Sequence, residues 1–226
     1  MLEQVHVCVI TDAGLAPGRD HAAIAEGALA GGAGMVQLRD KTGDLRALLP
    51  QARRIEALCR SCGALCIVND RLDLALAVDA DGVHVGQDDL PAETARRLLG
   101  PGRILGVSTH TREQAVAAQL AGADYIGFGP MFATGTKVTG YSPRGLDALR
   151  EVRRAVRLPI LAIGGITLTN VAEVIAAGAT APAVISAIVA APDVRAAAAG
   201  FRELVMAAKS RFTPESPGSW RGAVSS

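Results

Sequence analysis

The stretch ILGVSTHTREQAVAAQLAGADYIGFG, residues 104–129, contains one complete strand–helix–strand unit. A short apolar run at 104–108 precedes an Ala-rich stretch of helical period at 112–121, and a second apolar run follows at 125–129. Gly122 stands between the helix and the second run, where a helix end favours a residue that adopts a left-handed conformation. Short strands that alternate with longer helices predict a parallel sheet, because parallel strands need crossover connections.

The same alternation extends over most of the chain and predicts its architecture. Apolar runs are interpreted as strands at 7–11, 35–39, 65–69, 82–85, 104–108, 125–129, 160–164 and 183–186. Helices are expected between the strands and after the last one, among them 24–30, 45–59, 92–99, 112–121, 146–155, 169–177 and 194–210. Eight strands with helices between them predict an α/β fold, a (β/α)₈ TIM barrel. The alternative is an open doubly wound sheet, which the lack of a GxGxxG motif after the first run disfavours.

The composition fits one folded domain. Hydrophobic residues make up 50% of the 226 residues and aromatic residues only 3%. This composition excludes a disordered chain and suits a core of Ala, Val, Leu and Ile. We expect a single barrel domain over residues 1–211. Pro, Ser and Gly dominate the end of the chain, so residues 212–226 are expected to form a disordered tail.

The charge balance excludes several classes of partner. Lys and Arg total 23 against 22 acidic residues, which gives a net charge of +1 and no field for nucleic acid or an anionic membrane. No apolar run approaches the roughly 20 residues that span a bilayer. Residues 1–12 carry no basic segment, so no signal peptide is expected. These features predict a cytoplasmic protein whose oligomeric state the sequence leaves open, a homo-oligomer included.

The cysteines are spaced as in some metal or redox motifs, but a structural role is favoured. A zinc site normally needs four ligands, and no fourth Cys or His follows Cys59, Cys62 and Cys66 at a short interval. We expect Cys59 and Cys62 to end a helix before Gly63, and Cys66 to pack in a strand as a small hydrophobic residue.

Polar residues gather after the expected strands, where a TIM barrel builds its active site. The turn Gly164–Gly165 and the end Ile185–Ser186 follow strands seven and eight. Backbone N–H groups at that place bind phosphate without a charged side chain. The alternative is that the two glycines only make a tight turn.

A second anion site is expected from charged side chains on other strands. The cations Arg39, Lys41 and Lys137 would meet the carboxylates Asp70 and Asp89 at one rim. Carboxylates would repel a phosphorylated substrate unless a hard cation lay between them, and Mg²⁺ binds in this way. The pattern therefore predicts a diphosphate with Mg²⁺. In the alternative interpretation, Arg39 with Asp40 and Asp70 with Arg71 form surface ion pairs.

The histidines and serines support weaker predictions. His110 stands at a strand end, where a general base and a hydrogen-bonded structural group are both compatible with the sequence. His84 is expected to pack or form a hydrogen bond inside the barrel, and His6 and His21 suggest no function. Ser108 and Ser186 are expected to lack the His and acid partners of a nucleophilic triad, so acyl transfer is not predicted.

Several segments together resemble the thiamine phosphate synthase family, over about residues 5–190. They are VITD (9–12), VQLRDK (36–41), VNDRLDLALAVDADGVHVGQDDLP (68–91), GVSTHT (106–111), GADYIGFGPMFATGTK (122–137), LAIGGIT (161–167) and VISAI (184–188). The resemblance implies a TIM-barrel transferase of thiamine biosynthesis. Such an enzyme joins a hydroxymethylpyrimidine diphosphate to a thiazole phosphate and releases pyrophosphate.

The resemblance also implies roles for individual residues. The pyrimidine diphosphate would be contacted by Gln37, Arg39, Lys41, Asn69, Ser108 and Lys137, and Arg39, Lys41, Ser108 and Lys137 would act in catalysis. Asp70 and Asp89 would bind Mg²⁺. The thiazole phosphate would be contacted by Thr134, Gly135, Thr136, Gly165, Ile185 and Ser186.

Two segments depart from the family pattern. The loop 138–141 lacks the acidic residue that commonly follows the lysine and is closer to the related thiazole tautomerases. Residues 180–182 replace a usual Asp-Gly before strand eight, which we expect not to affect the site. The alternatives are therefore a tautomerase that uses His110, and a non-catalytic thiazole-phosphate binding protein. The pair Asp70 and Asp89, which tautomerases generally lack, favours the synthase.

Overall fold

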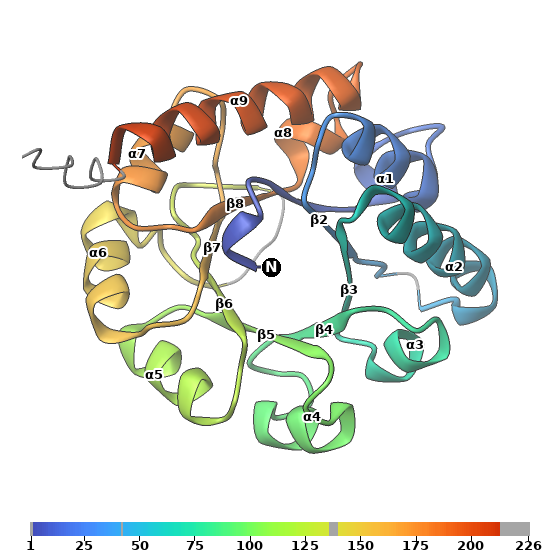
Figure 1. The fold of residues 1–226 in the computed structure, drawn as a ribbon, viewed down its shortest axis with the longest axis horizontal. Coiled ribbons are helices and arrows are strands. Elements are labelled where there is room, and N and C mark those ends of the chain that lie inside the picture. The colour runs from blue at the N-terminus through green and yellow to red at the C-terminus, as the bar shows by residue number, and fades with distance from the viewer. Residues whose placement is uncertain (1, 42, 136–139, 213–226) are drawn as a thin grey trace, which may run out of the picture.

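The computed structural model describes residues 2–41, 43–135 and 140–212. Its eight strands are all parallel and close into a barrel in the order β1 to β8, with helices around the outside (Figure 1). The predicted (β/α)₈ architecture is therefore confirmed. Thr136, Lys137 and the first half of the loop 138–141 lie outside the described residues, as does the expected tail 212–226 from residue 213 onward. Its first residue, Phe212, is instead the last residue of a helix.

The strands are short and the helices vary in length. The strands are β1 Cys8–Ile10, β2 Met35–Leu38, β3 Leu65–Asn69, β4 Gly82–Val85, β5 Ile104–Thr109, β6 Tyr125–Phe128, β7 Ile160–Ile163 and β8 Ala181–Val184. The α-helices are α1 His21–Ala30, α2 Leu45–Cys62, α3 Leu72–Ala77, α4 Ala92–Leu99, α5 Arg112–Leu120, α6 Gly145–Ala155, α7 Val171–Ala176, α8 Ser186–Val189 and α9 Val194–Phe212. Two 3₁₀ turns, η1 Leu2–Gln4 and η2 Ala13–Leu15, flank β1.

Strand β8 lies two residues earlier than the sequence predicts. The strand begins at Ala181 instead of residue 183, so Pro182 lies within it and pairs with Ala162 of β7. The pairing with β1 begins only at Ala183, one residue after the proline. Ser186, which was expected to end this strand, is the first residue of helix α8.

Local sequence explains where several helices begin and end. Asp20, Asp44 and Thr111 cap α1, α2 and α5 because each side chain accepts a hydrogen bond from a backbone N–H of the first turn. Helix α2 ends at Cys62, and Gly63 follows in the left-handed conformation. Cys66 is buried in β3, so the expected structural placement of these cysteines is confirmed.

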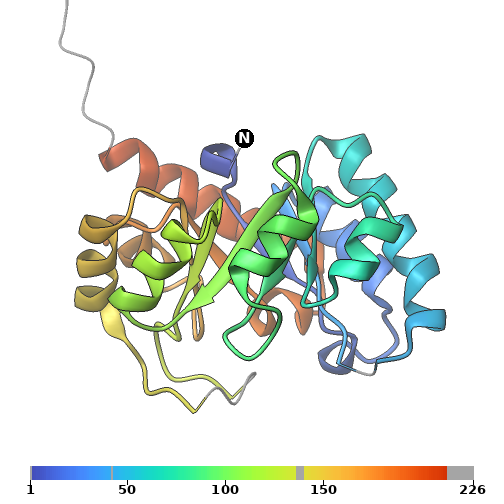
Figure 2. The ribbon, with the colours of Figure 1, turned by 90° about the horizontal axis from the view of Figure 1, so that it is seen from below.

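The strand ends separate the barrel into two different faces. Figure 2 shows the N-terminal turn η1 at one end and the chain that follows β6, in yellow-green, at the other. Lys209 of α9 holds the N-terminal end, because its Nζ donates to the carbonyl oxygen of Val5 at 3.2 Å. The opposite face, formed by the carboxyl ends of the strands, carries the polar residues described below. Among the described residues, no helix is long and apolar enough to span a membrane.

Candidate active site

The inside of the barrel opens toward the carboxyl ends of the strands as a small cavity of about 40 Å³, into which several polar side chains reach. Every strand contributes to its lining, which includes Gln37, Arg39, Asn69, His84, Ser108 and Tyr125. Four of the residues expected at the pyrimidine diphosphate, namely Gln37, Arg39, Asn69 and Ser108, therefore lie together. This volume holds one or two water molecules and is too small for a substrate. The space therefore forms the floor of a larger site, and we call it the polar floor after the side chains that reach into it.

A chain of hydrogen bonds holds Ser108 in this floor. The Oγ of Ser108 lies 2.9 Å from Nε2 of His84, and Nδ1 of His84 lies 2.9 Å from the hydroxyl of Tyr125. Burial raises the pKa of Tyr125 well above its usual range, so the phenol stays protonated. A Cβ at Gly106 would lie 2.1 Å from the Tyr125 ring, so only glycine leaves room for this contact.

The expectation that Ser108 lacks a histidine partner is wrong. His84 of β4 and Ser108 of β5 both point into the barrel, which brings the two side chains together. The second nitrogen of His84 contacts the phenol of Tyr125, where a nucleophilic triad would have a carboxylate. The prediction that His84 forms a hydrogen bond inside the barrel is confirmed.

Arg39 is held at the cavity by Asp12, which follows β1. Its Nη1 lies 2.6 Å from Oδ2 of Asp12, and both side chains are largely buried. The other oxygen of Asp12 accepts the N–H of Gly14 at 3.1 Å. Oδ1 of Asp40 lies 3.6 Å from Nε2 of His21. Arg39 therefore pairs with Asp12 and not with Asp40, which was the alternative interpretation.

Lys41, Asp70 and Asp89 form a charged cluster at the same rim. Nζ of Lys41 lies 3.0 Å from Oδ2 of Asp70, and Oδ2 of Asp89 accepts the N–H of Gly86 at 2.8 Å. Burial and the neighbouring carboxyl of Asp70 raise the pKa of Asp89. Asp70 has φ +62°, a conformation that few residues other than glycine adopt. Arg71 pairs with Asp73 at 2.6 Å, so the expected alternative pair of Asp70 with Arg71 is likewise not formed.

The chemistry of this cluster fits Mg²⁺. Within residues 2–41, 43–135 and 140–212, no group of three or more His, Cys, Asp or Glu side chains gathers around one point. The protein instead offers two neighbouring carboxylates, whose mutual repulsion a cation between them would relieve. Mg²⁺ suits such an incomplete ligand set, because it commonly keeps several waters and binds one or two carboxylates plus substrate phosphates.

A larger cavity of about 380 Å³ adjoins the polar floor. It is formed by the ends of β5 to β8 and by the first residues of α8. Five residues line both cavities: Ser108, Gly127, Ile163, Ala183 and Ile185. The two spaces are therefore neighbours, and Ser108 is the side chain with a hydroxyl group at their boundary.

The larger cavity contains most of the expected phosphate site. Thr134, Gly165, Ile185 and Ser186 line it, and α8 begins at Ser186. A short helix after strand eight is where many TIM barrels bind phosphate through backbone N–H groups. Gly135 is exposed and is not among the lining residues. Thr136 and Lys137 lie outside the described residues.

His110 also lines the larger cavity. Its Nδ1 lies 2.6 Å from the carbonyl oxygen of Gly129, so that nitrogen carries the proton and donates. The ring stacks on Tyr141 with centroids 3.9 Å apart, and the guanidinium of Arg144 lies 5.0 Å from the same tyrosine ring. These contacts anchor the end of the loop 138–141 beside the cavity.

Known proteins share both this fold and much of this sequence. The chain is 54% identical to a thiamine-phosphate synthase of Chloroflexus aurantiacus over 87% of its length and 91% of that protein. It is 51% identical to a thiamine-phosphate synthase of Moorella thermoacetica over 93% of its length and 100% of that protein. The family model of thiamine monophosphate synthase matches residues 7–188.

The chain belongs to this family. A solved thiamine phosphate pyrophosphorylase from Pyrococcus furiosus superposes with a TM-score of 0.83 at 39% identity, covering 92% of this chain and 98% of that chain. A solved 3-hexulose-6-phosphate synthase has a TM-score of 0.62 at 19% identity, a likeness that concerns the fold alone. The family expected from the sequence motifs is confirmed.

Three residues of the site were not predicted from the sequence. Asp12 received no role from the sequence beyond its place in the segment 9–12, although its position two residues after β1 places it at the rim by the same rule that selected Arg39. Tyr125 lies at the start of β6 and reaches the site only because Gly106 leaves space beside it. Gln87, whose Nε2 donates to the carbonyl oxygen of Ser108 at 2.6 Å, stands in the loop after β4 and carries no distinguishing signal.

Proposed function

We propose that the chain is a thiamine phosphate synthase, which joins a hydroxymethylpyrimidine diphosphate to a thiazole phosphate and releases pyrophosphate. The observation that carries this proposal is the pair of adjoining cavities that meet at Ser108. One has cations and paired carboxylates at its rim, and the other ends in a glycine turn and a helix start. A reaction between a diphosphate and a monophosphate needs both kinds of site side by side.

Each substrate is assigned to one group of residues. The pyrimidine diphosphate contacts Gln37, Arg39, Lys41, Asn69, Ser108 and Lys137, and the thiazole phosphate contacts Thr134, Gly135, Thr136, Gly165, Ile185 and Ser186. Two groups of described residues support this assignment. The smaller cavity is lined by Gln37, Arg39, Asn69 and Ser108 of the first set, and the larger cavity by Thr134, Gly165, Ile185 and Ser186 of the second. Gly135 lines neither cavity. Lys41 lies at the rim through its contact with Asp70. Lys137 and Thr136 are assigned by the family motif alone.

Charge stabilisation is the main catalytic task of these residues. The bond between the pyrimidine methylene and the diphosphate oxygen breaks first, and its electron pair leaves with pyrophosphate. Arg39, Lys41 and Lys137 stabilise the charge that develops on this leaving group. Mg²⁺ bound by Asp70 and Asp89 would neutralise further charge on the diphosphate oxygens. In other enzymes the loss of one such group costs on the order of 3 kcal/mol in the transition state.

The second half of the reaction needs no protein nucleophile. The amino group of the pyrimidine delocalises the positive charge on the methylene carbon, and the lone pair of the thiazole nitrogen forms the new C–N bond. The nitrogen becomes part of a thiazolium, so no proton has to be removed there. This agrees with a Ser108 whose histidine partner contacts a phenol instead of a carboxylate.

One incubation tests this function against its alternatives. The chain is incubated with both phosphorylated substrates, with Mg²⁺ or with a chelator in excess. A synthase forms thiamine phosphate and pyrophosphate in equal amounts and stops when the metal is removed. An isomerase acting through His110 would convert the thiazole phosphate alone without the metal. A binding protein would show thiazole-phosphate binding by calorimetry and no product.

A further inference from the structure

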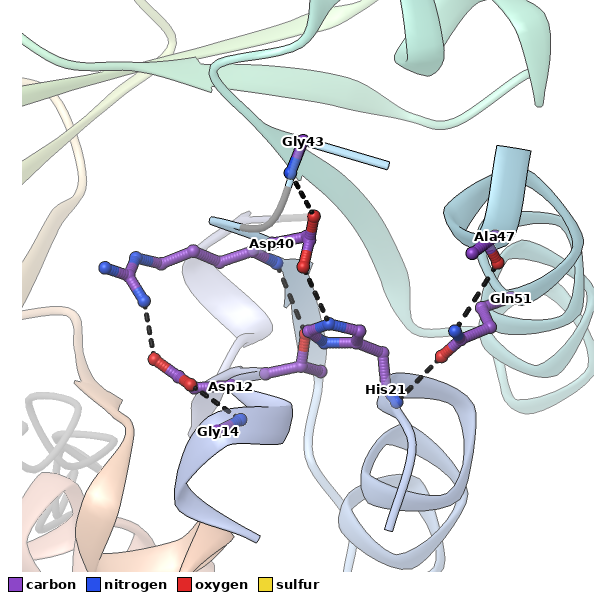
Figure 3. Close-up of polar contacts among 9 residues, drawn as sticks. Asp12, Gly14, His21, Asp40, Gly43, Ala47 and Gln51 are labelled. Carbon is purple, nitrogen blue, oxygen red and sulfur yellow. Dashed lines mark hydrogen bonds and ion pairs between the residues drawn. The ribbon is translucent and has the colours of Figure 1, made fainter. Parts of the chain in front are cut away.

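Thr11, His21 and Asp40 form a row of polar side chains that line neither cavity. The row lies beside the segment 39–41, which carries two cations of the rim. Oγ1 of Thr11 lies 2.8 Å from Nδ1 of His21. On the other side of the ring, Nε2 of His21 lies 3.6 Å from Oδ1 of Asp40 (Figure 3). Thr11 directly follows β1, His21 is the first residue of α1, and Asp40 lies in the loop after β2. Thr11 is fully buried and His21 is 4% exposed, so water does not compete for these contacts.

The hydrogen bonds indicate where the protons lie. Oγ1 of Thr11 accepts the backbone N–H of Arg39 at 3.2 Å, which leaves its own hydroxyl proton for Nδ1 of His21. The ring proton then lies on Nε2 and faces the carboxylate of Asp40. Burial lowers the pKa of His21, although Asp40 opposes this effect, so the ring is neutral at pH 7.

This arrangement resembles a catalytic triad but has no access to a substrate. The oxygen of Thr11 is fully buried and already accepts a hydrogen bond from the backbone of Arg39. Thr11 and His21 line neither of the two cavities at the site. The three residues therefore act on other parts of the protein and not on reacting atoms.

The part of the protein that they hold is the segment with the two cations. Asp40 stands between Arg39 and Lys41, and its Oδ2 accepts the N–H of Gly43 at 3.1 Å. Through Thr11, the same network also holds the backbone N–H of Arg39. His21 is itself fixed, because its backbone N–H donates to Oε1 of Gln51 on α2 at 2.9 Å (Figure 3). The ring of His21 thus connects the residue after β1 with the loop after β2, and its backbone N–H ties α1 to α2.

We propose that His21 is a positioning residue of the synthase. Together with Thr11 and Asp40, it fixes the backbone at residues 39–41 so that Arg39 and Lys41 face the diphosphate. The identity of the bound anion rests on the function proposed above. The role of His21 itself concerns affinity for the diphosphate and leaves the phosphate site after β7 and β8 unaffected.

Two substitutions at Thr11 test the network with little change of volume. Thr11→Val removes the hydroxyl, and Thr11→Ser keeps it. We expect Thr11→Val to raise KM for the pyrimidine diphosphate on the order of tenfold, since one buried hydrogen bond is worth about that factor. KM for the thiazole phosphate should stay unchanged. Thr11→Ser should restore the wild-type KM.

Substitution of the imidazole gives a second measurement that does not need turnover. His21→Gln places its amide near Nε2 and loses the acceptor at Nδ1. We expect it to weaken the binding of inorganic pyrophosphate with Mg²⁺ on the order of tenfold in calorimetry. Glu26→Gln is the matched control on the same helix, because Glu26 contacts only the exposed Arg54 among the contacts that the structure describes. It should bind pyrophosphate as the wild type does.

The outcomes separate this proposal from the proposed function. Unchanged KM and pyrophosphate affinity in Thr11→Val, with an active wild type, would overturn the role of His21. Equal increases in KM for both substrates would also overturn it, because they indicate general damage. If the wild type forms no thiamine phosphate but Thr11→Val still weakens pyrophosphate binding, the positioning role stands and the synthase function fails. Should His21→Gln not fold, the Thr11 pair still decides the question.

Discussion

Oγ of Ser108 lies 2.9 Å from Nε2 of His84, at the boundary of the two cavities. The chain of hydrogen bonds formed by Ser108, His84 and Tyr125 fixes the orientation of the Ser108 hydroxyl. The place where the two substrates would meet therefore carries an oriented hydroxyl group, while the charged groups lie at the rim.

Removal of this hydroxyl should affect turnover more than folding. Ser108→Ala is expected to lower kcat on the order of 100-fold, the usual effect of losing one oriented donor at developing charge. Steady-state kinetics with both substrates measures the effect. The control is Ser61→Ala, because Ser61 is exposed on α2 and its hydroxyl contacts only Leu58 and Cys62 of its own helix among the contacts described. A wild-type kcat in Ser108→Ala would remove the hydroxyl from the mechanism.

The two rim carboxylates should determine the metal requirement. Asp70→Asn and Asp89→Asn each remove one charge, and asparagine tolerates the left-handed backbone at position 70. We expect the Mg²⁺ concentration for half-maximal rate to rise on the order of tenfold or more in each variant. Asp73→Asn is the control, since Asp73 is exposed and pairs with Arg71. Equal Mg²⁺ titrations for the wild type and both rim variants would exclude the proposed ligands.

The glycine turn after β7 should be sensitive to a single methyl group. Gly165 has φ +66°, and a Cβ there would lie 2.7 Å from the carbonyl oxygen of Ala133. Gly165→Ala should raise KM for the thiazole phosphate and cost on the order of 1–3 kcal/mol in the free energy of unfolding. Gly102→Ala meets no atom within 4 Å and should change neither quantity. A change in KM for the diphosphate alone would contradict the assignment of this turn.

Stability should fall on mild acidification because of His6, far from the site. Burial and the neighbouring Lys209 and Arg202 lower the pKa of His6, and its Nδ1 is buried without a hydrogen-bond partner among the described residues. The unfolded chain then binds more protons than the folded protein as the pH falls through about 6.5. The contribution of His6 to the free energy of unfolding is therefore fully present above that pH. It is lost as the pH falls toward the lower pKa of His6 in the folded protein.

His6→Asn isolates this contribution. The Tm of the wild type should drop further between pH 7.5 and pH 5.5 than the Tm of the variant, with activity at pH 7.5 unchanged in both. Calorimetric or optical melting curves at several pH values measure the difference. Parallel Tm curves for the two proteins would show that His6 titrates alike in the folded and unfolded states.

The strand–helix alternation was sufficient to predict the barrel, because each strand is a short apolar run bounded by helix signals. The predicted limits of strands and helices were wrong where those signals were weak. Strand β8 was placed two residues late because Pro182 suggested a strand start. Helix α3 has only six residues and follows a polar segment, so no helical period was evident between β3 and β4.

The position of a residue relative to its strand predicted which side chains meet, but not how they pair. Arg39 and Asp70 were placed at the rim from their strand ends alone. Arg39 pairs with Asp12, and Asp70 pairs with Lys41. These pairings depend on how far each side chain reaches toward the neighbouring strand, which residue spacing along the sequence does not determine. The contact of His84 with Ser108 likewise depends on the stagger of the strands within a closed barrel.

Two separate, adjoining anion sites can be detected by simultaneous binding at the two cavities. Calorimetry would measure the binding of inorganic pyrophosphate with Mg²⁺ to the protein, first alone and then saturated with thiazole phosphate. Two adjoining sites that meet at Ser108 predict that pyrophosphate binds at one equivalent in both titrations. Loss of pyrophosphate binding in the presence of thiazole phosphate, as expected for competition at one shared anion site, would contradict the account.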